Sequence, residues 1–299
     1  MGYIIVDLEF NGMRDITKYD SDFYKKHPEL EASELENEII EIGAVKVDKY
    51  MQVVSTMKEY IKPVLYPIIN PIVNKITKID MEMLNSKGIL FKDGMNKLKE
   101  MFEDGDILCS WAKDDIVELI VNANYFGYED LEWIKHYLDL QEYATKILAY
   151  KKPLGLKSAL DDLKVKVDEE SLHDAFYDAE CTKEVFKRIY NSRGIKNYIV
   201  EDIYNMPALE IEELDKVEIK EEELKLYCPK CKKRIEIETP IKAVKWRFIC
   251  VGTCPKCKKP VQCEIVPKKT LRNDIIYIEN NNIISNEIYV NQCYKLSNK

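Results

Sequence analysis

The segment Gly2–Phe10 (GYIIVDLEF) is the feature that most restricts what this chain can fold into. It has the pattern of a buried β-strand whose apolar sequence is interrupted by Asp7 and Glu9. Side chains two positions apart on a strand point to the same face, so both carboxylates project together from an apolar element. Two half-buried anions repel each other and are poorly solvated, and a divalent cation between them relieves both effects. The pair therefore predicts a metal site.

Two later segments supply the other groups that a two-metal hydrolytic site needs. Asp115 ends the segment Ser110–Asp115 (SWAKDD), and His173 and Asp178 lie in HDAFYD. Four carboxylates and one histidine suit the two-metal hydrolysis of a phosphodiester. Each residue alone has an ordinary explanation, such as a helix N-cap at Asp114 or Asp115 or a surface histidine. The combination and its order are what support the hypothesis.

Length and composition indicate a globular protein of about two domains. The chain has 299 residues, 46% of them hydrophobic, with only 10 Gly and 11 Pro. No apolar run approaches the ~18 residues of a membrane span, and no basic region of a signal peptide precedes the first apolar stretch. Nine cysteines without such a signal favour a reducing compartment, in which clustered thiols bind metal. We expect a cytoplasmic protein without a membrane partner.

The net charge of −8 conceals an uneven distribution along the chain. Residues 225–269 contain 13 Lys or Arg and 3 Glu, a formal charge of +10, whereas residues 1–224 carry a formal −18. A basic module on an acidic body predicts binding of a polyanion. The alternative is a lysine-rich surface that is merely well solvated.

Strand and helix patterns alternate over the first 190 residues. This order predicts an α/β or mixed-sheet domain with helices packed on the faces of the sheet. Besides the first strand, strands are predicted at 39–47, 53–61 and 106–111, and helices near 95–102, 115–125, 141–148, 156–163 and 174–190. The polar insertion at 11–37 has no clear pattern.

The predicted domain organisation has four parts. Residues 1–195 form the α/β domain, and 196–226 form an acidic linker. Residues 227–270 form a small cysteine-containing β domain. Residues 271–299 form a tail whose two Ile- and Tyr-rich runs predict a β-hairpin.

The acid and histidine motifs and the sequence around them resemble the DEDDh exonucleases, a DnaQ-like family of 3′→5′ exonucleases. IIEIGAVKV (Ile39–Val47) is similar to the second strand of that family, GLKSALDDL to its pre-catalytic helix and HDAFYDAECT to its last motif. SWAKDD is similar to the SWGxxD form of the branch with RNase T-like and KapD-like members. The resemblance covers residues 1–192 and implies an RNase H-like mixed sheet of five strands flanked by helices.

The resemblance implies a role for each of five residues. Asp7, Glu9, Asp115 and Asp178 would bind two Mg²⁺ or Mn²⁺ ions, and His173 would be the general base. Hard oxygen ligands suit these cations. An imidazole is able to accept the proton of a water molecule near neutral pH.

Positions around the motifs refine this comparison. A tyrosine would replace Asp174 in the sister DEDDy group, so the histidine form is favoured. The spacing after the Trp of SWAKDD favours Asp115 over Asp114 as the ligand. Ala112 stands where the SWGxxD form has glycine, and Lys78 replaces the usual glycine of an LTGI-like stretch. In the family that stretch lies beside the terminal nucleotide of the substrate, so we expect Lys78 to affect substrate preference.

Two CPKC pairs, Cys228–Cys231 and Cys254–Cys257, are separated by 22 residues. This spacing is typical of a zinc ribbon in which four thiolates bind one structural Zn²⁺. Strands at 234–238 and 245–249 would form the ribbon. Cys250 is an alternative ligand to Cys254, which is favoured because CPKC repeats the first pair.

The ribbon also contains aromatic residues next to cations. Such pairs stack on bases while they contact phosphates. The alternative is that Trp246 and Phe248, at alternate positions and therefore on one face, fill the small core of the ribbon. The candidate nucleic-acid contacts are Lys245, Trp246, Arg247, Lys258 and Lys259.

Together these features predict a metal-dependent 3′→5′ exonuclease that acts on single-stranded nucleic acid or a 3′ overhang. RNA is favoured over DNA on the SWxxxD resemblance alone. One alternative is a DNA exonuclease of proofreading or repair. Another is a non-catalytic nucleic-acid-binding regulator on the same scaffold, although the five intact site residues argue against it.

Overall fold

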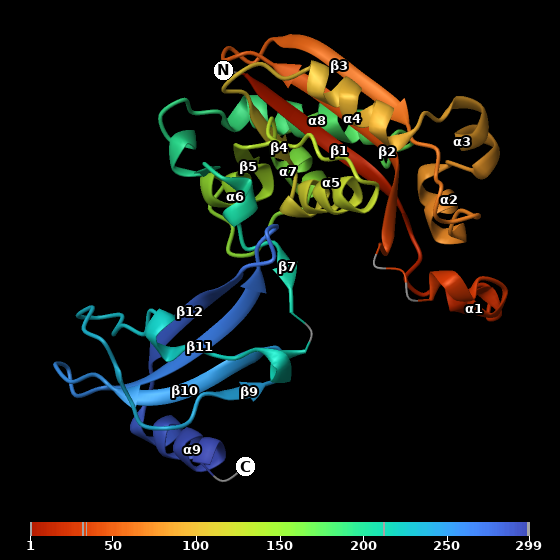
Figure 1. The fold of residues 1–299 in the computed structure, drawn as a ribbon. Helices are drawn as coiled ribbons and strands as arrows, with labels where there is room; N and C mark the ends of the chain where they lie inside the picture. The colour runs from red at the N-terminus through yellow and green to blue at the C-terminus, as the bar shows by residue number, and fades with distance from the viewer. Residues whose placement is uncertain (1, 32, 34, 212, 298–299) are drawn as a thin grey trace. The chain divides into compact units, whose positions relative to one another are not determined.

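Strand β1 (Tyr3–Gly12) is central to the first of two units in the computed structural model (Figure 1). The structure describes residues 2–31, 33, 35–211 and 213–297. Unit 1 spans Met1–Ile203 and unit 2 spans Tyr204–Lys299. No helix in the described ranges is long and apolar enough to cross a membrane.

Unit 1 contains a mixed six-stranded sheet in the order β3-β2-β1-β4-β5-β6. The other strands are β2 (Asn37–Val47), β3 (Val53–Tyr60), β4 (Ile107–Ser110), β5 (Tyr137–Asp139) and β6 (Ile199–Val200). Strand β1 pairs antiparallel with β2 and parallel with β4. The predicted mixed α/β fold is confirmed. The sixth strand, β6, comes from the segment that was predicted to be a linker.

Helices flank this sheet, as Figure 1 shows. The helices are α1 (Phe23–Lys26), α2 (Pro71–Thr77), α3 (Met81–Lys87), α4 (Phe91–Glu100), α5 (Lys113–Tyr125), α6 (Leu140–Ile147), α7 (Leu156–Asp162) and α8 (Ala175–Ile189). Helix α8 begins where the Asp174 side chain accepts a hydrogen bond from the Tyr177 N–H, and it carries Lys187 and Arg188 in its last turn. Both features stabilise the ends of a helix.

The main core lies between one face of the sheet and α6, α7 and α8. Tyr3 and Ile5 of β1 enter it together with Val185 and Phe186 of α8. Because side chains alternate along a strand, Asp7 and Glu9 project from the same face of β1 as Tyr3 and Ile5. The two acids at positions 7 and 9 therefore continue the line of core residues toward the end of β1.

The polar insertion at 11–37 contains α1 and two short 3₁₀ helices, Ile16–Lys18 and Pro28–Leu30. Its apolar side chains form a small core of their own with Tyr66. The insertion is thus held to the domain by a few buried side chains spaced irregularly along it. This explains why the sequence showed no helical or strand period there.

Unit 2 contains a second sheet in the order β12-β11-β10-β8, with β7 paired to β11 and β9 to β10. The bounds are β7 (Leu209–Glu210), β8 (Glu236–Ile237), β9 (Lys242–Val244), β10 (Arg247–Thr253), β11 (Pro260–Lys269) and β12 (Ile275–Ile283), followed by α9 (Asn286–Ser297). Short 3₁₀ helices occur at Ile195–Asn197, Ile203–Asn205, Leu214–Lys216 and Glu221–Glu223.

The acidic segment 196–226 differs from the predicted linker because both units use it. Strand β6 pairs with β5 in unit 1. Leu214, Leu224 and Leu226 are buried in the core of unit 2. Apolar residues at irregular spacing anchor this segment, and its many glutamates hid them.

The tail also differs from the predicted hairpin. Strand β12 does form a hairpin, but its partner is the preceding strand β11, in register from Lys269↔Ile275 to Val261↔Ile283. The second Ile- and Tyr-rich run is helix α9, which buries Leu296 against Ile249 and Val251. Asn280–Asn282, which separate the two runs in the sequence and would have formed the turn of the predicted hairpin, lie within β12.

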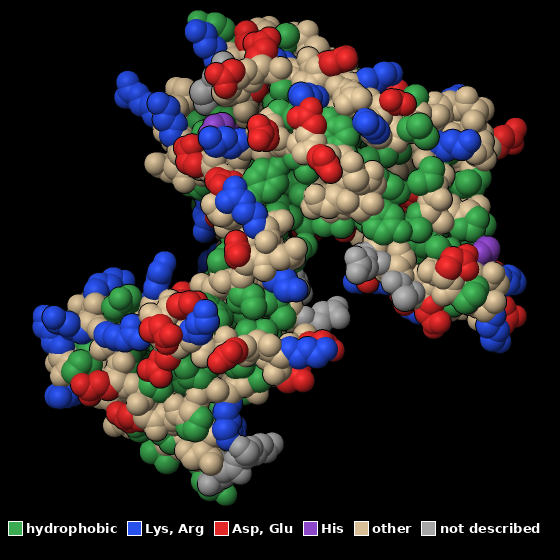
Figure 2. Space-filling view, in the orientation of Figure 1, with side chains coloured by type: hydrophobic (Ala, Val, Ile, Leu, Met, Phe, Trp, Pro, Cys, Tyr) green, Lys and Arg blue, Asp and Glu red, His purple; other side chains and the backbone are tan. Residues whose placement is uncertain are grey.

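Including the acidic segment changes the charge of the second unit. Residues 204–299 contain 18 Lys or Arg and 14 Asp or Glu, a formal +4, whereas residues 1–203 carry 27 and 39, a formal −12. Figure 2 shows cationic and anionic side chains interspersed on the visible face of unit 2. The polyanion-binding prediction therefore depends on local groups of cations and less on net charge.

Candidate active site

Asp7 and Glu9 are half-buried on the face of β1 that packs against α8. The register with β2 places Glu9 directly opposite Glu41 and Asp7 opposite Gly43. The absence of a side chain at Gly43 is required, because a Cβ there would lie 2.2 Å from the backbone of Ala175. The start of α8 therefore lies tightly against the sheet beside the two acids.

Asp115 reaches the same region from another element. Strand β4 runs parallel to β1, and α5 follows it with Asp114 and Asp115 in the first turn. Asp115 is half-buried and accepts a hydrogen bond from the backbone of Leu8, whereas Asp114 is exposed. Asp115 is also the neighbour that most strongly raises the pKa of Asp7. Of the two candidates, Asp115 is the one at the cluster.

Helix α8 and the residue preceding its cap supply the last two groups. The ligand atoms of Glu9, His173 and Asp178 lie within 4.8 Å of one another. The backbone N–H of His173 donates to Oδ2 of Asp178 at 3.1 Å, and His173 has a left-handed backbone with φ 67°. The His173 side chain is exposed, so its imidazole is accessible to water.

Burial and mutual repulsion raise the pKa of every carboxyl group in this cluster. The pKa of Glu9 is raised to about 8 by burial and then by Glu41, and that of Asp115 to about 8 by burial and then by Asp114. Burial, followed by the charge of Asp115, raises the pKa of Asp7 well above its usual range. Burial also raises the pKa of Asp178, opposed by its hydrogen bond from His173.

One buried oxygen at the cluster, on Asp178, lacks a hydrogen-bond donor among the described residues. Oδ1 of Asp178 is buried and has no partner in the described part of the chain. An unpaired buried carboxylate oxygen among four repelling acids fits a divalent cation, which would coordinate that oxygen and offset the negative charge. The residues present are therefore suited to Mg²⁺ or Mn²⁺.

Two residues that the sequence patterns did not mark hold the start of α8 in place. Oε2 of Glu41 accepts a hydrogen bond from the N–H of Ala175 at 3.3 Å, and Glu41 is buried. Lys58 of β3 lies 3.3 Å from Glu41 and also donates to Asp174, the N-cap of α8. The contacts of Glu41 and Lys58 with Asp174 and Ala175 fix the first turn of α8. That turn carries Asp178, and Asp174 directly follows His173.

Glu41 had a detectable signal in the sequence, and Lys58 did not. Glu41 is the only acid inside the apolar run Ile39–Val47, just as Asp7 and Glu9 are the only acids inside the apolar run Gly2–Phe10. Lys58 lies on a half-exposed strand of mixed composition. Its contact with Asp174 spans 116 positions of the chain, which no local pattern reports.

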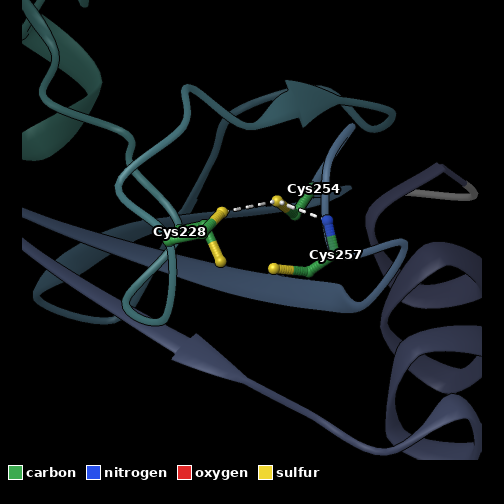
Figure 3. Close-up of side chains that lie close together, drawn as sticks. Cys228, Cys254 and Cys257 are labelled. Carbon is green, nitrogen blue, oxygen red and sulfur yellow. Dashed lines mark hydrogen bonds between the residues drawn. The ribbon is translucent and has the colours of Figure 1, made fainter.

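The four cysteines of the CPKC pairs form a second cluster, in unit 2. The sulfur atoms of Cys228, Cys231, Cys254 and Cys257 all lie within 4.8 Å of one another. Figure 3 shows the sulfurs of Cys228, Cys254 and Cys257 turned toward a common centre. Four convergent thiols are the donor set of a structural Zn²⁺ site. Cys231 raises the pKa of Cys257 to about 12, an effect that a bound cation would reverse.

Cys250 lies outside this cluster. It pairs with Cys263 across β10 and β11, and both side chains are buried in the core of unit 2. The structure therefore groups Cys254, and not Cys250, with the other three cysteines. All nine cysteines of the chain are free thiols.

The two ring residues of the ribbon have different environments. Lys245 and Trp246 form the two-residue turn between β9 and β10, and the Trp246 side chain is 59% exposed. The Arg247 guanidinium lies 4.6 Å from the centroid of the Trp246 ring. Phe248, in contrast, is buried. The core-filling alternative holds for Phe248 alone.

Lys258 and Lys259 lie at the second CPKC pair. Lys258 has a left-handed backbone, and its N–H donates to the carbonyl of Cys254 at 2.8 Å. The Lys259 carbonyl accepts from the N–H of Cys254 at 3.0 Å. Both side chains are exposed, so the backbone shapes the cysteine turn while the ammonium groups face solvent.

Comparisons with known proteins agree with the fold and site of unit 1. Residues 4–186 match the family model for the RNase T exonucleases. The nuclease domain of 3′hExo, a DEDDh family member bound to rAMP, is 15% identical with a TM-score of 0.53, and the match covers 67% of this chain and 96% of that one. A second structure, described as 3′-end specific recognition of histone mRNA stem-loop by 3′-exonuclease, is 15% identical with a TM-score of 0.50. The match covers 63% of this chain and 80% of that one. No curated protein matches the chain.

The two structures are too distant in sequence to show more than the shared fold. The family match is stronger, because it spans more than half of the chain and contains all four acids and the histidine. The chain therefore belongs to the RNase T exonuclease family and is a 3′→5′ exonuclease of the DEDDh type.

Proposed function

We propose that this protein degrades single-stranded RNA from the 3′ end by metal-dependent hydrolysis at the acidic cluster of unit 1. The observation that carries the proposal is the convergence of Asp7, Glu9, Asp115 and Asp178 beside His173. The unpartnered buried oxygen of Asp178 supports it further, because that oxygen is a ready metal ligand.

In this proposal the four carboxylates hold two Mg²⁺ or Mn²⁺ ions. Bound ions of this kind activate the attacking water and stabilise the charge on the phosphate and the leaving oxygen. The residues of the chain position the reaction: Asp7 and Glu9 lie on a rigid central strand, and Asp178 lies on a helix turn fixed by Glu41 and Lys58. Rigid elements hold reacting groups more accurately than loops do.

His173 is the proposed general base. Its side chain is exposed beside the cluster, and its backbone N–H is anchored to the Asp178 carboxylate. An imidazole in this place would take the proton of the attacking water and release it to solvent. The anchored backbone keeps the ring close to the carboxylates during the reaction.

RNA is the proposed substrate for two reasons. The segment SWAKDD resembles the SWGxxD motif of the RNase T-like branch of the family. The two similar structures described above concern rAMP and a histone mRNA stem-loop. The nine free thiols are consistent with the proposal that the protein acts in the reducing cytoplasm.

Unit 2 is proposed to be a nucleic-acid-binding module stabilised by one Zn²⁺ at its four-cysteine cluster. The exposed Trp246 ring between Lys245 and Arg247 supports this role, because such a ring stacks on a base while the cations contact phosphates. Lys258 and Lys259 would add further phosphate contacts. The module would retain long strands on a protein whose unit 1 is acidic.

The test is a panel of RNA and DNA oligonucleotides of the same sequence, labelled at the 5′ end, incubated with the protein and Mg²⁺ or Mn²⁺. The proposal expects a ladder of shortened 5′-labelled RNA products, faster degradation of RNA than DNA, and no reaction in EDTA. A 3′-labelled oligonucleotide should release labelled mononucleotide at once. Faster degradation of DNA would overturn the substrate assignment, and the absence of any degradation would overturn the proposed function.

A further inference from the structure

A cavity of about 470 Å³ lies beside the proposed general base in unit 1. It is lined by His173 and by residues of β3, α2, α3 and α8, among them Lys58, Tyr60, Lys78 and Phe176. The cavity therefore combines the proposed general base with apolar and aromatic side chains. Such a surface is suited to the sugar and base of a nucleotide.

The charges around the cavity are mostly negative or already paired. Glu170, Asp174 and Glu180 line it. The ammonium group of Lys58 is engaged by Glu41 and Asp174. A phosphate that entered here would therefore meet repulsion unless another cation were present.

Lys78 is that cation. Its Nζ donates to the backbone carbonyl of Lys75 at 2.6 Å, and no carboxylate of the described residues lies within ion-pair distance of it. A hydrogen bond to a neutral carbonyl leaves the positive charge uncompensated. The side chain is exposed, so the ammonium is free to turn toward a bound anion.

The backbone of Lys78 explains how the side chain comes to lie at the rim of the cavity. Lys78 ends α2 with a left-handed backbone, φ 64°, and its N–H donates to the carbonyl of Asn74 at 2.9 Å. Glycine is the usual residue in this conformation. The chain also places Lys164 and Lys232 in it, so the conformation alone indicates no function. The position of Lys78 on the same cavity as His173 is what matters.

We infer that Lys78 binds a phosphate of the RNA strand next to the one that is cleaved, inside the cavity beside His173. This inference rests on the proposed function. The cations of the metal site would offset the charge of the reacting phosphate, whereas the neighbouring phosphate lies outside that site. The uncompensated ammonium of Lys78 supplies the partner for it, and Lys78 thereby contributes to substrate binding without touching the reacting atoms.

The test measures binding of a 5′-fluorescent RNA oligonucleotide by fluorescence anisotropy, with Ca²⁺ present and at several salt concentrations. The variants Lys78→Gly and Lys78→Asn remove the charge and suit the left-handed backbone, so the fold should be retained. We expect both to bind about tenfold more weakly than wild type, as for one lost charge-assisted hydrogen bond. The slope of log affinity against log salt should be shallower by about 0.7, the value for one phosphate of a single strand. Lys78→Arg should bind like wild type.

Lys75→Asn is the matched control, because Lys75 is an exposed lysine of the same helix that does not line the cavity. It should leave affinity and slope unchanged. A second experiment replaces each of the three linkages nearest the 3′ end, one at a time, with a neutral methylphosphonate. One of these substitutions should weaken binding to wild type about tenfold and have no effect on Lys78→Gly.

Equal affinity and salt slope in wild type and Lys78→Gly would overturn the inference, as would an equal loss in Lys75→Asn. The inference would also be overturned if every linkage whose substitution weakens binding to wild type weakened binding to Lys78→Gly equally, because no phosphate would then depend on Lys78. The binding measurement does not depend on turnover. If the wild-type protein failed to degrade RNA, the proposed function would be wrong. The anisotropy measurement would still show whether Lys78 contacts a phosphate of the RNA.

Discussion

The two candidate metal sites of this chain are built in opposite ways. The acidic cluster collects residues from positions 7 to 178 and from three separate elements, so it exists only when the sheet and its helices are assembled. The cysteine cluster consists of two local turns. In each, the first cysteine N–H donates to the carbonyl five residues on, at 2.8 Å in Cys228 and 3.0 Å in Cys254, and the lysine between has a left-handed backbone.

This difference determines which site depends on its metal for folding. Unit 1 has a large core that holds the acids together against their mutual repulsion. Unit 2 has a smaller core, and the four sulfur atoms of its two cysteine turns lie within 4.8 Å of one another. We therefore expect unit 1 to fold without metal and unit 2 to need its Zn²⁺.

The largest expected difference between the two sites is the effect of losing zinc on the folding of unit 2. Structural Zn²⁺ binding in small domains contributes on the order of 10 kcal/mol, so Cys228→Ser or a strong chelator should unfold unit 2. Calorimetry should show one of two transitions lost, with the transition of unit 1 unchanged. Cys293→Ser, outside the cluster, is the control and should retain both transitions. Two intact transitions in chelator-treated protein would contradict the expectation that unit 2 needs Zn²⁺ to fold.

The next effect concerns the rate of the reaction. His173→Ala should lower kcat by about 10²–10⁴-fold with little change in KM, because it removes a proton acceptor and leaves the metal ligands in place. His136→Ala changes a histidine of unit 1 that pairs with Glu201 away from the cluster, and it should retain the wild-type rate. A wild-type rate in His173→Ala would show that His173 is not the general base.

A smaller effect concerns the stability of the metal-free protein. The folded-state pKa of Glu9, about 8, exceeds the ordinary value of 4.5, so between pH 4.5 and 8 the folded state retains a proton that the unfolded state has released. This group therefore makes the folded protein less stable as the pH rises through that window. In EDTA at pH 8, Glu9→Gln should raise the free energy of unfolding by about 1–2 kcal/mol.

Thermal denaturation in EDTA at pH 5 and pH 8 checks this expectation. The gain in Glu9→Gln should be large at pH 8 and small at pH 5, where Glu9 is protonated in the folded state. The exposed Glu100→Gln on α4 should change stability by less than about 0.5 kcal/mol at either pH. A destabilised Glu9→Gln would show that the carboxylates attract a structural partner other than a metal ion.

The smallest effect concerns the surface of unit 2. Trp246→Ala should weaken binding of long single strands by about 1–2 kcal/mol, as for one lost base stack, and leave affinity for a dinucleotide unchanged. Tyr294→Ala removes an aromatic side chain of unit 2 that is 70% exposed, and it should have no effect. Equal affinities for all three proteins would indicate that unit 2 contacts something other than nucleic acid.

The sequence predicted those parts of the molecule that have a local period. The strands of β1 and β2, the helices α5 to α8 and both CPKC pairs each show their pattern within about fifteen residues. The same-face position of Asp7 and Glu9 follows from strand alternation alone. The spacing after Trp111 already favoured Asp115 over Asp114, and the structure adds that Asp115 is half-buried whereas Asp114 is exposed.

Contacts between distant segments were not predictable in this way. The Lys58 link to Asp174 and the leucines of the acidic segment have no period that a window of sequence shows. Helix α9 was missed because β-branched and tyrosine residues favour strands, and packing of Leu296 against Ile249 overrides that preference. The exposure of Trp246 was not predictable because the alternation of side chains along a strand does not continue through a two-residue turn.

The most direct test of the central claim compares two adjacent residues. Asp114 and Asp115 have the same chemistry and the same helix turn, but only Asp115 lies at the acidic cluster. Calorimetric titration with Mn²⁺ and the degradation of labelled RNA should be measured for Asp114→Asn and Asp115→Asn. Asp115→Asn should lose tight Mn²⁺ binding and nearly all activity, whereas Asp114→Asn should keep both. Similar behaviour of the two variants, or full activity in Asp115→Asn, would contradict the assignment of the metal site.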